Sequence, residues 1–483
     1  MKQFFRFSIL LLALLLPALA SAYDFQVDGI CYNINGNEAT VTSKGDYYNM
    51  YFVGYLGAVV IPSTVTHYGI TYPVTAIDEI AFYCCEGLTS IDIPSSITKI
   101  GDFAFGNCPA LTSIVVESGN PRYDSRNNCN AIISTADNTL IYGCKNTMIP
   151  NSVTKIGNFA FEGCHGLTSI VIPNSVTAIG NKAFYNCDGL SRIIIPNSVT
   201  VIGNNVFENC DELAGIVIES GNPRYDSRDN CNAIIETADN TLIVGCKNTT
   251  IPNSVTTIGN FAFCYCWGLT SIIIPNSVTV IGKCAFEGCI GLTSVEIGNS
   301  VTSIGRYAFY SCWGLTSIII PNSVTEIGDN AFYYCTGLTS IVIPNSVTSI
   351  GNEAFKNCWM LADVYCYIAD LSGVSCGNEQ FHKEYNGDYS GRTLHVLQGA
   401  ADAYRADKNW YPYFGQIVDD LKPDVPGDVN GDGEVNIADV NAVINIILSG
   451  NGSTTAADVN GDGEINVADV NAVIDIILNG TGN

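Results

Sequence analysis

The stretch IPNSVTSIGNEAFKNCWML, from Ile343 to Leu361, decides the fold, because much of this 483-residue chain repeats it. Consecutive copies are 23 residues apart, and variants begin at Ile61, Ile93 and Ile297. A fixed period of this length indicates a solenoid, in which each unit buries its apolar face only against its neighbours. The phrase IPNSVT itself begins at Ile149, Ile172, Ile195, Ile251, Ile274, Ile320 and Ile343.

The first half of each unit, L-T-S-I-x-I-P, has the strand spacing of leucine-rich repeats. Alternation along a strand places Ile341 and Ile343 inward and Val342 outward, and the following proline ends the strand. Val347 and Ile350 supply a second inward pair. We therefore predict a right-handed leucine-rich-repeat superhelix that is mainly β.

The second half of each unit should turn and return to the core. Gly351 permits a tight turn, and we expect Ala354-Phe355 to pack a short helical or 3₁₀ segment inside. The repeats are followed by two domains that lack the 23-residue period. The predicted divisions are a signal peptide (1–22), an N-terminal β-hairpin cap (23–57), the repeats (58–358), a C-terminal cap (359–421), a linker (422–427) and a calcium-binding domain (428–483).

The first 22 residues have the pattern of a signal peptide. Lys2 and Arg6 are basic, Phe7 to Leu16 is apolar, and Ala20-Ser21-Ala22 is a cleavage motif. No later apolar run reaches the roughly 18 residues that span a bilayer. We expect an exported protein, secreted or at the cell surface, without a transmembrane segment.

Two units carry a 33-residue expansion, at 117–149 and 219–251. The expansions are nearly identical and lie 102 residues apart, which indicates duplication of a block of several coils. Each should form a hairpin around an Asp-Asn turn. Pairing the hairpin about its Ala-Asp centre places Cys129 opposite Cys144, and Cys231 opposite Cys246, so these two pairs are candidate disulfides.

The phrase IPNSVTxIGxxAFxxC, its NPRYDS expansions and the N-terminal hairpin resemble the BspA-like leucine-rich-repeat proteins. The resemblance covers about Tyr23 to Leu421. It implies an exported bacterial surface protein that functions in adhesion or in binding a protein ligand, such as a host or matrix protein.

The last block contains two copies of D-V-N-G-D-G-E, followed by apolar residues at helical spacing. Oxygen-bearing side chains recur at the spacing that calcium loops require. The predicted ligands of one ion are Asp428, Asn430, Asp432, Glu434 (through its backbone carbonyl), Asn436 and Asp439. Those of a second ion are Asp458, Asn460, Asp462, Glu464 (through its backbone carbonyl), Asn466 and Asp469.

Aspartate at the twelfth loop position, with no helix before the loop, resembles a type I dockerin, a small all-α, EF-hand-like domain. The resemblance implies a cohesin-like partner. The pairs Ile437-Ala438 and Val467-Ala468 stand where dockerins often carry the Ser/Thr pair that recognises the partner, so this sequence departs from the family there.

The charge distribution excludes a nucleic-acid-binding protein. The formal net charge is −25, and twelve acidic residues lie between Ile417 and Asn483 against one lysine. A basic surface for phosphates is therefore missing.

Ten of the 20 cysteines occupy one position of the repeat. Stacked one coil apart, at about 4.8 Å, their parallel side chains lie too far apart for disulfides. We predict a reduced, buried ladder, and a metal array is the alternative. The ladder consists of Cys85, Cys108, Cys164, Cys187, Cys210, Cys266, Cys289, Cys312, Cys335 and Cys358.

The residue after each ladder cysteine varies, which indicates exposure, and three of the four tryptophans stand there: Trp267, Trp313 and Trp359. Because tryptophan is enriched at binding hot spots, this column is a candidate ligand surface, with partial packing as the alternative. A second candidate is the outward strand column, which is also apolar: Val171, Ile194, Val217, Ile273, Ile319 and Val342.

None of the four histidines belongs to a metal or nucleophile motif, and we expect no enzymatic activity. The favoured function is a binding or adhesion protein with a docking tail. One alternative is an accessory component or enzyme of a dockerin-assembled, polysaccharide-degrading complex. Another is a spacer whose tail is an intramolecular calcium clamp.

Overall fold

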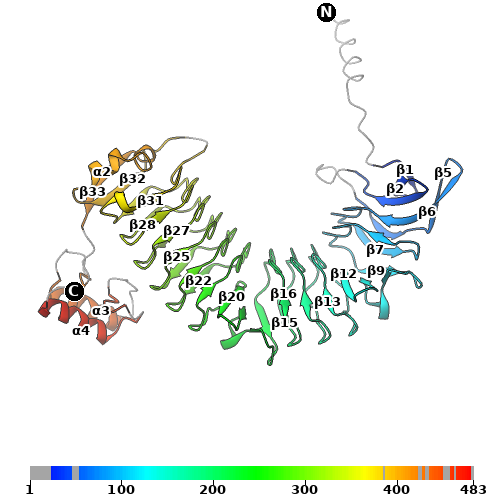
Figure 1. Cartoon of the computed structure of the whole chain (residues 1–483), viewed down its shortest axis with the longest axis horizontal. Coiled ribbons are helices and arrows are strands. Elements are labelled where there is room, and N and C mark those ends of the chain that lie inside the picture. Colours follow the sequence, from blue (N-terminus) through cyan, green and yellow to red (C-terminus); the bar gives the residue numbers. More distant parts are fainter. Residues whose placement is uncertain are drawn as a thin grey trace, which may run out of the picture. The chain divides into compact units, whose positions relative to one another are not determined.

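The computed structural model describes residues 23–45, 54–384, 387–422, 427–429, 435–449, 457–461 and 464–479. The predicted signal peptide lies outside them. None of the helices in this part of the chain combines the length and apolarity that crossing a membrane requires. The chain divides into two compact units, one of residues 1–190 with 201–206 and one of residues 191–200 with 207–483, and each is described by itself (Figure 1).

The first unit starts with an antiparallel sheet that continues into the repeats. Strands β1, β2 and β3 pair antiparallel, β3 then pairs parallel with β6, and β6 forms a hairpin with β5. The strands are β1 (Phe25–Val27), β2 (Ile30–Asn35), β3 (Glu38–Thr42), β5 (Thr64–His67), β6 (Ile70–Ile77) and β8 (Lys99–Ile100).

The repeats of this unit build two further sheets. One is parallel and contains β4 (Gly57–Val60), β7 (Leu88–Ile93) and β9 (Ser113–Val116). The other starts with the antiparallel hairpin of the first expansion and continues parallel. It contains β10 (Tyr123–Asp124), β11 (Ala131–Ser134), β12 (Thr139–Gly143), β13 (Lys155–Ile156), β14 (Ala178–Ile179) and β16 (Val201–Ile202), with η1 (Arg126–Asn128) after β10.

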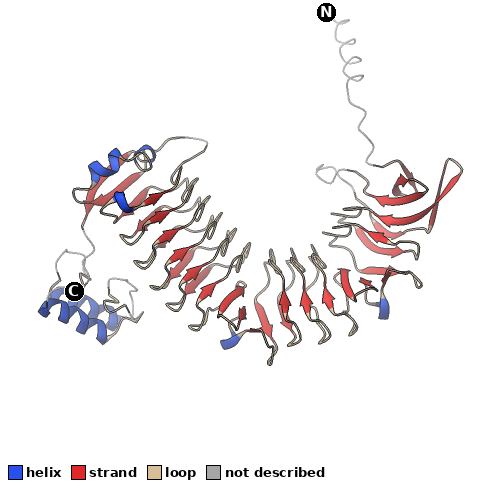
Figure 2. Ribbon diagram, in the orientation of Figure 1, coloured by secondary structure: helices blue, strands red, loops and turns tan. Residues whose placement is uncertain are grey.

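The second unit repeats this plan over more coils (Figure 2). Its longest sheet starts with the second expansion and contains β18 (Tyr225–Asp226), β19 (Ile234–Glu236), β20 (Thr241–Val244), β21 (Thr257–Ile258), β23 (Val280–Ile281), β25 (Ser303–Ile304), β27 (Glu326–Ile327), β29 (Ser349–Ile350) and β31 (Ser375–Cys376), with η2 (Arg228–Asn230) after β18. The other strands are β15 (Arg192–Ile195) with β17 (Gly215–Ile218), β22 (Ser271–Ile274) with β24 (Ser294–Ile297), and the sheet of β26 (Ser317–Ile319), β28 (Ser340–Ile343), β30 (Asp363–Cys366), β32 (Thr393–Leu397) and β33 (Gln416–Leu421).

The predicted alternation within the repeat strand is confirmed. In β28, Ile341 and Ile343 are buried and Val342 is half-buried. The register β26–β28–β30 aligns Ile341 with Ile318 and Val364, so each inward side chain packs on its equivalent in the neighbouring coils. Apolar burial of this kind, repeated in every coil, is the main source of stability.

The segment around Ala-Phe is a series of turns, so the helical or 3₁₀ segment predicted there does not form. Two residues per coil have positive φ, such as Asn330 at 54° and Tyr334 at 59°, and this left-handed backbone interrupts a helix. The freed backbone groups bond to the next coil instead, as where Phe332 N–H donates to the carbonyl of Ala354 at 2.7 Å. The phenylalanine rings stack in the same direction, with Phe309 and Phe332 centroids 5.2 Å apart.

The ladder cysteines are thiols outside any disulfide, all of them buried except the half-buried Cys266, and several donate hydrogen bonds. The Sγ of Cys335 lies 3.1 Å from the carbonyl oxygen of Phe309, one coil earlier. Five other ladder cysteines, Cys108, Cys187, Cys289, Cys312 and Cys358, repeat this contact at 3.0–3.1 Å. Burial raises the pKa of the Cys289, Cys312, Cys335 and Cys358 thiols, to about 12 for Cys358. The ladder therefore has a polar role that sequence reasoning did not foresee.

The expansions form the predicted hairpins, but their cysteines do not face each other. A β-bulge between Ile132 and Ile133 shifts the register, so that Ala131 pairs with Gly143. The thiol of Cys144 donates to the carbonyl of Asn130 at 3.4 Å, and Cys129 remains a free thiol. The same shift occurs between Ile234 and Ile235, where Cys231 and Cys246 are also free. The register therefore does not place either pair directly opposite, and all four cysteines are free thiols in this structure.

Residues 359–421 lose the 23-residue period but keep the ladder, because β30, β32 and β33 continue the sheet of β28. Arg392 is 1% exposed, and its guanidinium donates to the carbonyls of Leu361, Phe381 and Cys358 at 3.1, 2.6 and 3.2 Å. This arginine stabilises the end of the solenoid, because its guanidinium provides hydrogen-bond donors for three backbone carbonyls. The helices here are η3 (Leu371–Gly373), α2 (Ala401–Ala406) and η4 (Tyr411–Tyr413).

Candidate functional site

The C-terminal domain contains two helices, α3 (Ile437–Ser449) and α4 (Val467–Asn479), as the apolar spacing predicted. Val440, Val443 and Val473 form a small core between them. Such a small core needs additional stabilisation to hold two helices together.

In the second acidic loop, Asp469 gathers the loop around its carboxylate. Its Oδ1 accepts from the N–H of Asn460 at 3.2 Å, and its Oδ2 accepts from the N–H of Asn466 at 2.8 Å. Asn466 Oδ1 in turn accepts from the N–H of Ala468 at 2.7 Å, which caps the start of α4. The carboxylate of Asp469, at the twelfth position of the loop, is therefore hydrogen-bonded to the backbone of the third position (Asn460) and of the ninth (Asn466).

The first loop repeats this geometry where it is described. Asp439 Oδ2 accepts from the N–H of Asn436 at 2.9 Å, and Asn436 Oδ1 accepts from the N–H of Ala438 at 2.8 Å. Of the predicted ligands, Asp428, Asn436, Asp439, Asp458, Asn460, Glu464, Asn466 and Asp469 are described, whereas Asn430, Asp432, Glu434 and Asp462 lie outside the described residues.

The acidic loops fit a divalent cation. Asp439 and Asp469 are 0% exposed, and the sequence from residue 423 to 483 contains no lysine, arginine or histidine that could neutralise them. Buried carboxylates need a compensating charge, and hard oxygen ligands suit calcium. Four of the predicted ligands lie outside the described residues, and among the described residues alone no group of three or more His, Cys, Asp and Glu side chains could hold a metal.

Both helices of this domain expose apolar residues at equivalent positions. Ile437 and Val467, at the starts of α3 and α4, are 68% and 65% exposed, and Leu448 and Leu478 near their ends are also exposed. The duplicated exposure gives the domain two similar apolar surfaces, which are suited to a protein partner.

The candidate tryptophans of the solenoid lie on its surface. Trp267, Trp313 and Trp359 are 41%, 54% and 47% exposed, and they occur in alternate coils. Trp359 also contacts Tyr334 edge-to-face, with centroids 5.9 Å apart. In the outward strand column, Val171, Ile194, Ile273 and Ile319 are exposed, whereas Val217 and Val342 are half-buried.

A groove of about 530 Å³ on the second unit was not predicted from the sequence. It is rich in tyrosine and runs over the turns of consecutive coils. We call it the tyrosine groove, and its lining residues are Phe261, Tyr265, Lys283, Cys284, Glu287, Tyr307, Tyr310, Asn330, Tyr333 and Glu353. A search by repeat column could have found it, since Glu287, Tyr310 and Tyr333 occupy one position in consecutive units.

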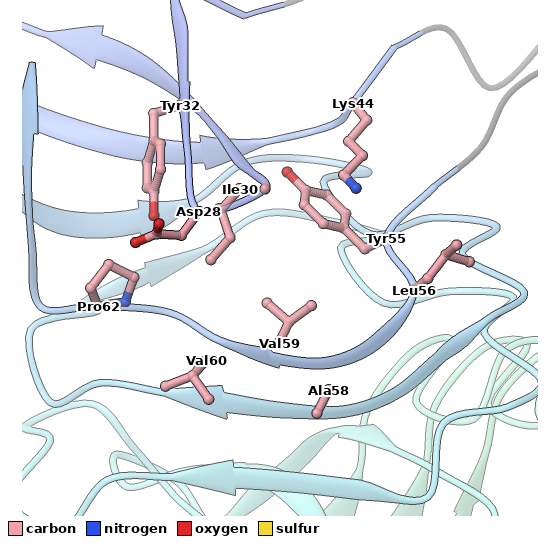
Figure 3. A pocket seen from close by; sticks show the side chains of 11 residues that line it. Asp28, Ile30, Tyr32, Lys44, Tyr55, Leu56, Ala58, Val59, Val60 and Pro62 are labelled. Carbon is pink, nitrogen blue, oxygen red and sulfur yellow. The ribbon is translucent and has the colours of Figure 1, made fainter.

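The N-terminal cap contains a smaller cavity, of about 230 Å³ (Figure 3). Tyr32, Tyr55, Lys44 and Asp28 line it together with apolar residues. The hydroxyl of Tyr55 donates to the carbonyl of Thr42 at 2.6 Å, whereas the buried hydroxyl of Tyr32 has no partner among the described residues.

The histidines have structural contacts. His395 lies between Asp420 and Asp363, at 2.8 and 3.4 Å, and its ring stacks on Tyr365. These residues belong to β30, β32 and β33, so the histidine joins neighbouring strands of the cap. His165 contacts Asn107 and Asp188.

Comparison with protein families identifies both parts of the chain. Six copies of a BspA type leucine-rich repeat region match residues 62–134, 137–236 and 243–365. A Dockerin type I domain matches residues 426–478. A search of curated proteins found no significant match.

Solved structures similar to this chain include bacterial leucine-rich-repeat proteins. A leucine-rich cell surface protein from Faecalibacterium prausnitzii is 29% identical, with 71% of this chain and 94% of that one covered and a TM-score of 0.47. The pneumococcal vaccine antigen PcpA is 20% identical, with 82% and 98% covered and a TM-score of 0.53. PcpA thus shares the fold.

Proposed function

Since this chain belongs to the BspA-type leucine-rich-repeat family and carries a C-terminal type I dockerin domain, we propose that it is an exported, non-enzymatic binding protein. Its solenoid binds a protein ligand, and its tail attaches it to a cohesin-like partner or to the cell surface. Export rests on the signal-peptide pattern of residues 1–22.

The observation that carries this proposal is the joining of a repeat scaffold with exposed aromatic residues to a docking domain. Trp267, Trp313 and Trp359 present large apolar surfaces on a rigid framework, where little conformational entropy is lost on binding. A protein ligand, such as a host or matrix protein, is the partner that this chemistry fits.

The tail docks through its two exposed apolar surfaces, around Ile437 and Val467, and only when it is folded. We propose that two calcium ions fold it, one at each set of predicted ligands. A bound calcium ion supplies the positive charge that Asp439 and Asp469 need. These two carboxylates orient the loop by accepting backbone N–H groups and hold the starts of α3 and α4.

Two alternatives lead to different observations. An accessory component or enzyme of a polysaccharide-degrading complex would share the docking tail but would act on a glycan. A spacer with a calcium clamp would bind neither a ligand nor a cohesin-like module.

The test is a pull-down from the envelope of the source cell and from candidate ligand preparations with the full chain, with and without a calcium chelator. We expect capture of a cohesin-like protein only with calcium, and capture of a protein ligand in both conditions. The triple substitution of Trp267, Trp313 and Trp359 by alanine should abolish ligand capture and leave docking intact. Ligand capture unchanged by the triple substitution would exclude the tryptophan column as the ligand site.

A further inference from the structure

The tyrosine groove has the composition of a site for a cationic side chain. It lies within the second unit, over the turns that follow β21, β23, β25, β27 and β29. Its aromatic rings come from three coils, and the acidic Glu287 and Glu353 stand at different places along it.

The rings are arranged as a continuous surface. Tyr310 and Tyr333 stack with centroids 5.3 Å apart and planes 11° apart, and Tyr307 meets Tyr310 edge-to-face at 5.5 Å. All three side chains are half-buried, so their positions are fixed. The guanidinium of Arg306 lies over the ring of Tyr307 at 4.7 Å and the ammonium of Lys356 lies over that of Tyr333 at 5.9 Å, whereas no cation lies over the ring of Tyr310 in the described part of the chain. Open tyrosine faces carry the negative potential that attracts lysine and arginine.

Glu287 supplies a carboxylate beside these rings. It accepts from the hydroxyl of Tyr265 at 3.4 Å, and no ion pair within 4.0 Å joins it to a basic side chain in the described part of the chain. Burial, and then the nearby Glu287, raise the pKa of Tyr265 to about 12. Burial, and then the hydrogen bond to Glu287, raise the pKa of Cys284 to about 12. Both groups therefore stay neutral near pH 7, so Tyr265 and Cys284 add no negative charge to that of Glu287.

The chain itself shows how a lysine fits against this surface. The ammonium of Lys356 lies 5.9 Å from the ring centroid of Tyr333 and 2.8 Å from Glu353. Glu379 and Glu384 complete its surroundings at 2.9 and 3.4 Å. Glu287, Tyr310, Tyr333 and Lys356 occupy the same repeat position in four consecutive coils. Lys356 therefore follows Tyr333 in this column as Glu287 precedes Tyr310. One coil before Glu287 the same column has Cys264, and Lys283, which also lines the groove, lies over the ring of Phe261 at 5.7 Å.

We propose that the tyrosine groove binds a lysine or arginine side chain of a basic peptide segment in the protein ligand, with its cation between Glu287 and the face of Tyr310. The occupant follows from charge complementarity, since the chain has a net charge of −25 and the groove joins ring faces to a carboxylate. This inference rests on the proposed function, because it names the chemistry of the ligand.

The test uses the full chain and a capped peptide of alternating glycine and arginine, titrated by calorimetry at about 150 mM salt, where long-range attraction is largely screened. We expect saturable binding. Tyr310→Ala should weaken it by roughly tenfold, as loss of a desolvated cation–π contact implies, although the variant leaves net charge unchanged. Tyr310→Leu, which preserves apolar volume, and Glu287→Gln should weaken it as well.

The matched control is Tyr185→Ala. Tyr185 occupies the repeat position of Tyr310, but its ring is already covered by Lys182 at 4.7 Å. Its substitution should leave peptide affinity unchanged. A peptide of alternating glycine and glutamate should not bind.

Equal weakening by Tyr185→Ala and Tyr310→Ala, or wild-type affinity in Tyr310→Leu and Glu287→Gln, would overturn the proposal. A neutral oligosaccharide that binds the groove would also overturn the proposal, provided that Tyr310→Leu abolishes its binding and the arginine peptide does not compete with it. These results leave the proposed function intact, because that function is judged by ligand capture in the triple tryptophan variant.

Discussion

The thiol of Cys312 donates a hydrogen bond to the carbonyl oxygen of Phe286, one coil earlier, at 3.1 Å. The same carbonyl accepts from the N–H of Cys289 in its own coil at 3.2 Å. The cysteine therefore packs as a small apolar side chain and also supplies a second donor to a buried backbone oxygen. Six ladder cysteines make this contact, and each of the six joins its coil to the preceding one.

Replacing Cys312 with alanine should destabilise the solenoid by about 1–2 kcal/mol, because it leaves a small cavity and removes this donor. Serine keeps a donor but shortens the side chain, so we expect a smaller loss for Cys312→Ser. Urea unfolding, followed by fluorescence, would measure both. An alanine variant as stable as the wild type would show that the thiol contact contributes nothing.

All ten ladder cysteines should be free in the native protein. Thiol counting after denaturation without reductant should give at least ten reactive groups. Mass spectrometry would assign them to the ladder positions. Protection of these cysteines from alkylation would contradict the prediction.

Glu162 should make the first unit more stable in mild acid than at neutral pH. This glutamate is 7% exposed, and burial raises its pKa despite a hydrogen bond from Tyr83 at 3.3 Å and the charge of Lys182. Above the raised pKa, the folded state holds a buried charge that the unfolded state solvates, so stability falls as pH rises through the interval between the unfolded and folded pKa values.

We therefore expect Glu162→Gln to stabilise the protein at pH 7 and to have little effect below about pH 4, where the ordinary carboxyl is protonated. Thermal unfolding across this range would show the difference. Glu212→Gln is the control, since Glu212 is exposed and accepts a hydrogen bond from Lys247, which lowers its pKa. Destabilisation of Glu162→Gln at pH 7 would contradict the argument.

Arg392→Lys should destabilise the last coils by about 2–4 kcal/mol. A lysine cannot reproduce the planar fork that reaches three carbonyls, and a buried charge with unmet donors is costly. Hydrogen exchange in β30 and β32 should become faster. Arg405→Lys is the control, because Arg405 is half-exposed and its loss should cost under about 1 kcal/mol.

Calcium removal should unfold the tail and leave the repeats unchanged. Calcium at about 100 times its Kd would stabilise the tail by about 2.7 kcal/mol if it binds only the folded form. With excess chelator, amides of α3 and α4 in the full chain should exchange faster, whereas those of the ladder should not. Asp428→Ala with Asp458→Ala should have the same effect. Equal protection of the helices in chelator would contradict the calcium assignment.

The sequence predicted the elements that depend on periodicity. The inward positions of Ile341 and Ile343 follow from alternation, and the helices after each acidic loop follow from their apolar spacing. Both patterns are local and recur at a fixed spacing, so they can be recognised from the sequence alone.

The features that were missed depend on backbone geometry or on neighbouring coils. Positive φ at Asn330 and Tyr334, in residues other than glycine, has no clear sequence signal and replaces the expected helical turn. The bulge after Ile132 moves Cys129 away from Cys144 by a single residue. The tyrosine groove is formed by the stacked turns of several coils, so its sequence signal lies in equivalent repeat positions and not in any single stretch.

The near-identical expansions have a consequence for how the gene can change. Deleting residues 117–218 would join Val116 to Glu219, and the natural junction there is Ile218-Glu219, which differs by one methyl group. Each expansion starts a new sheet with its own hairpin, so recombination between the two copies would remove a block of coils and leave an intact sheet start. Strains should therefore carry length variants that differ by multiples of 102 residues, and each would keep its docking tail in frame.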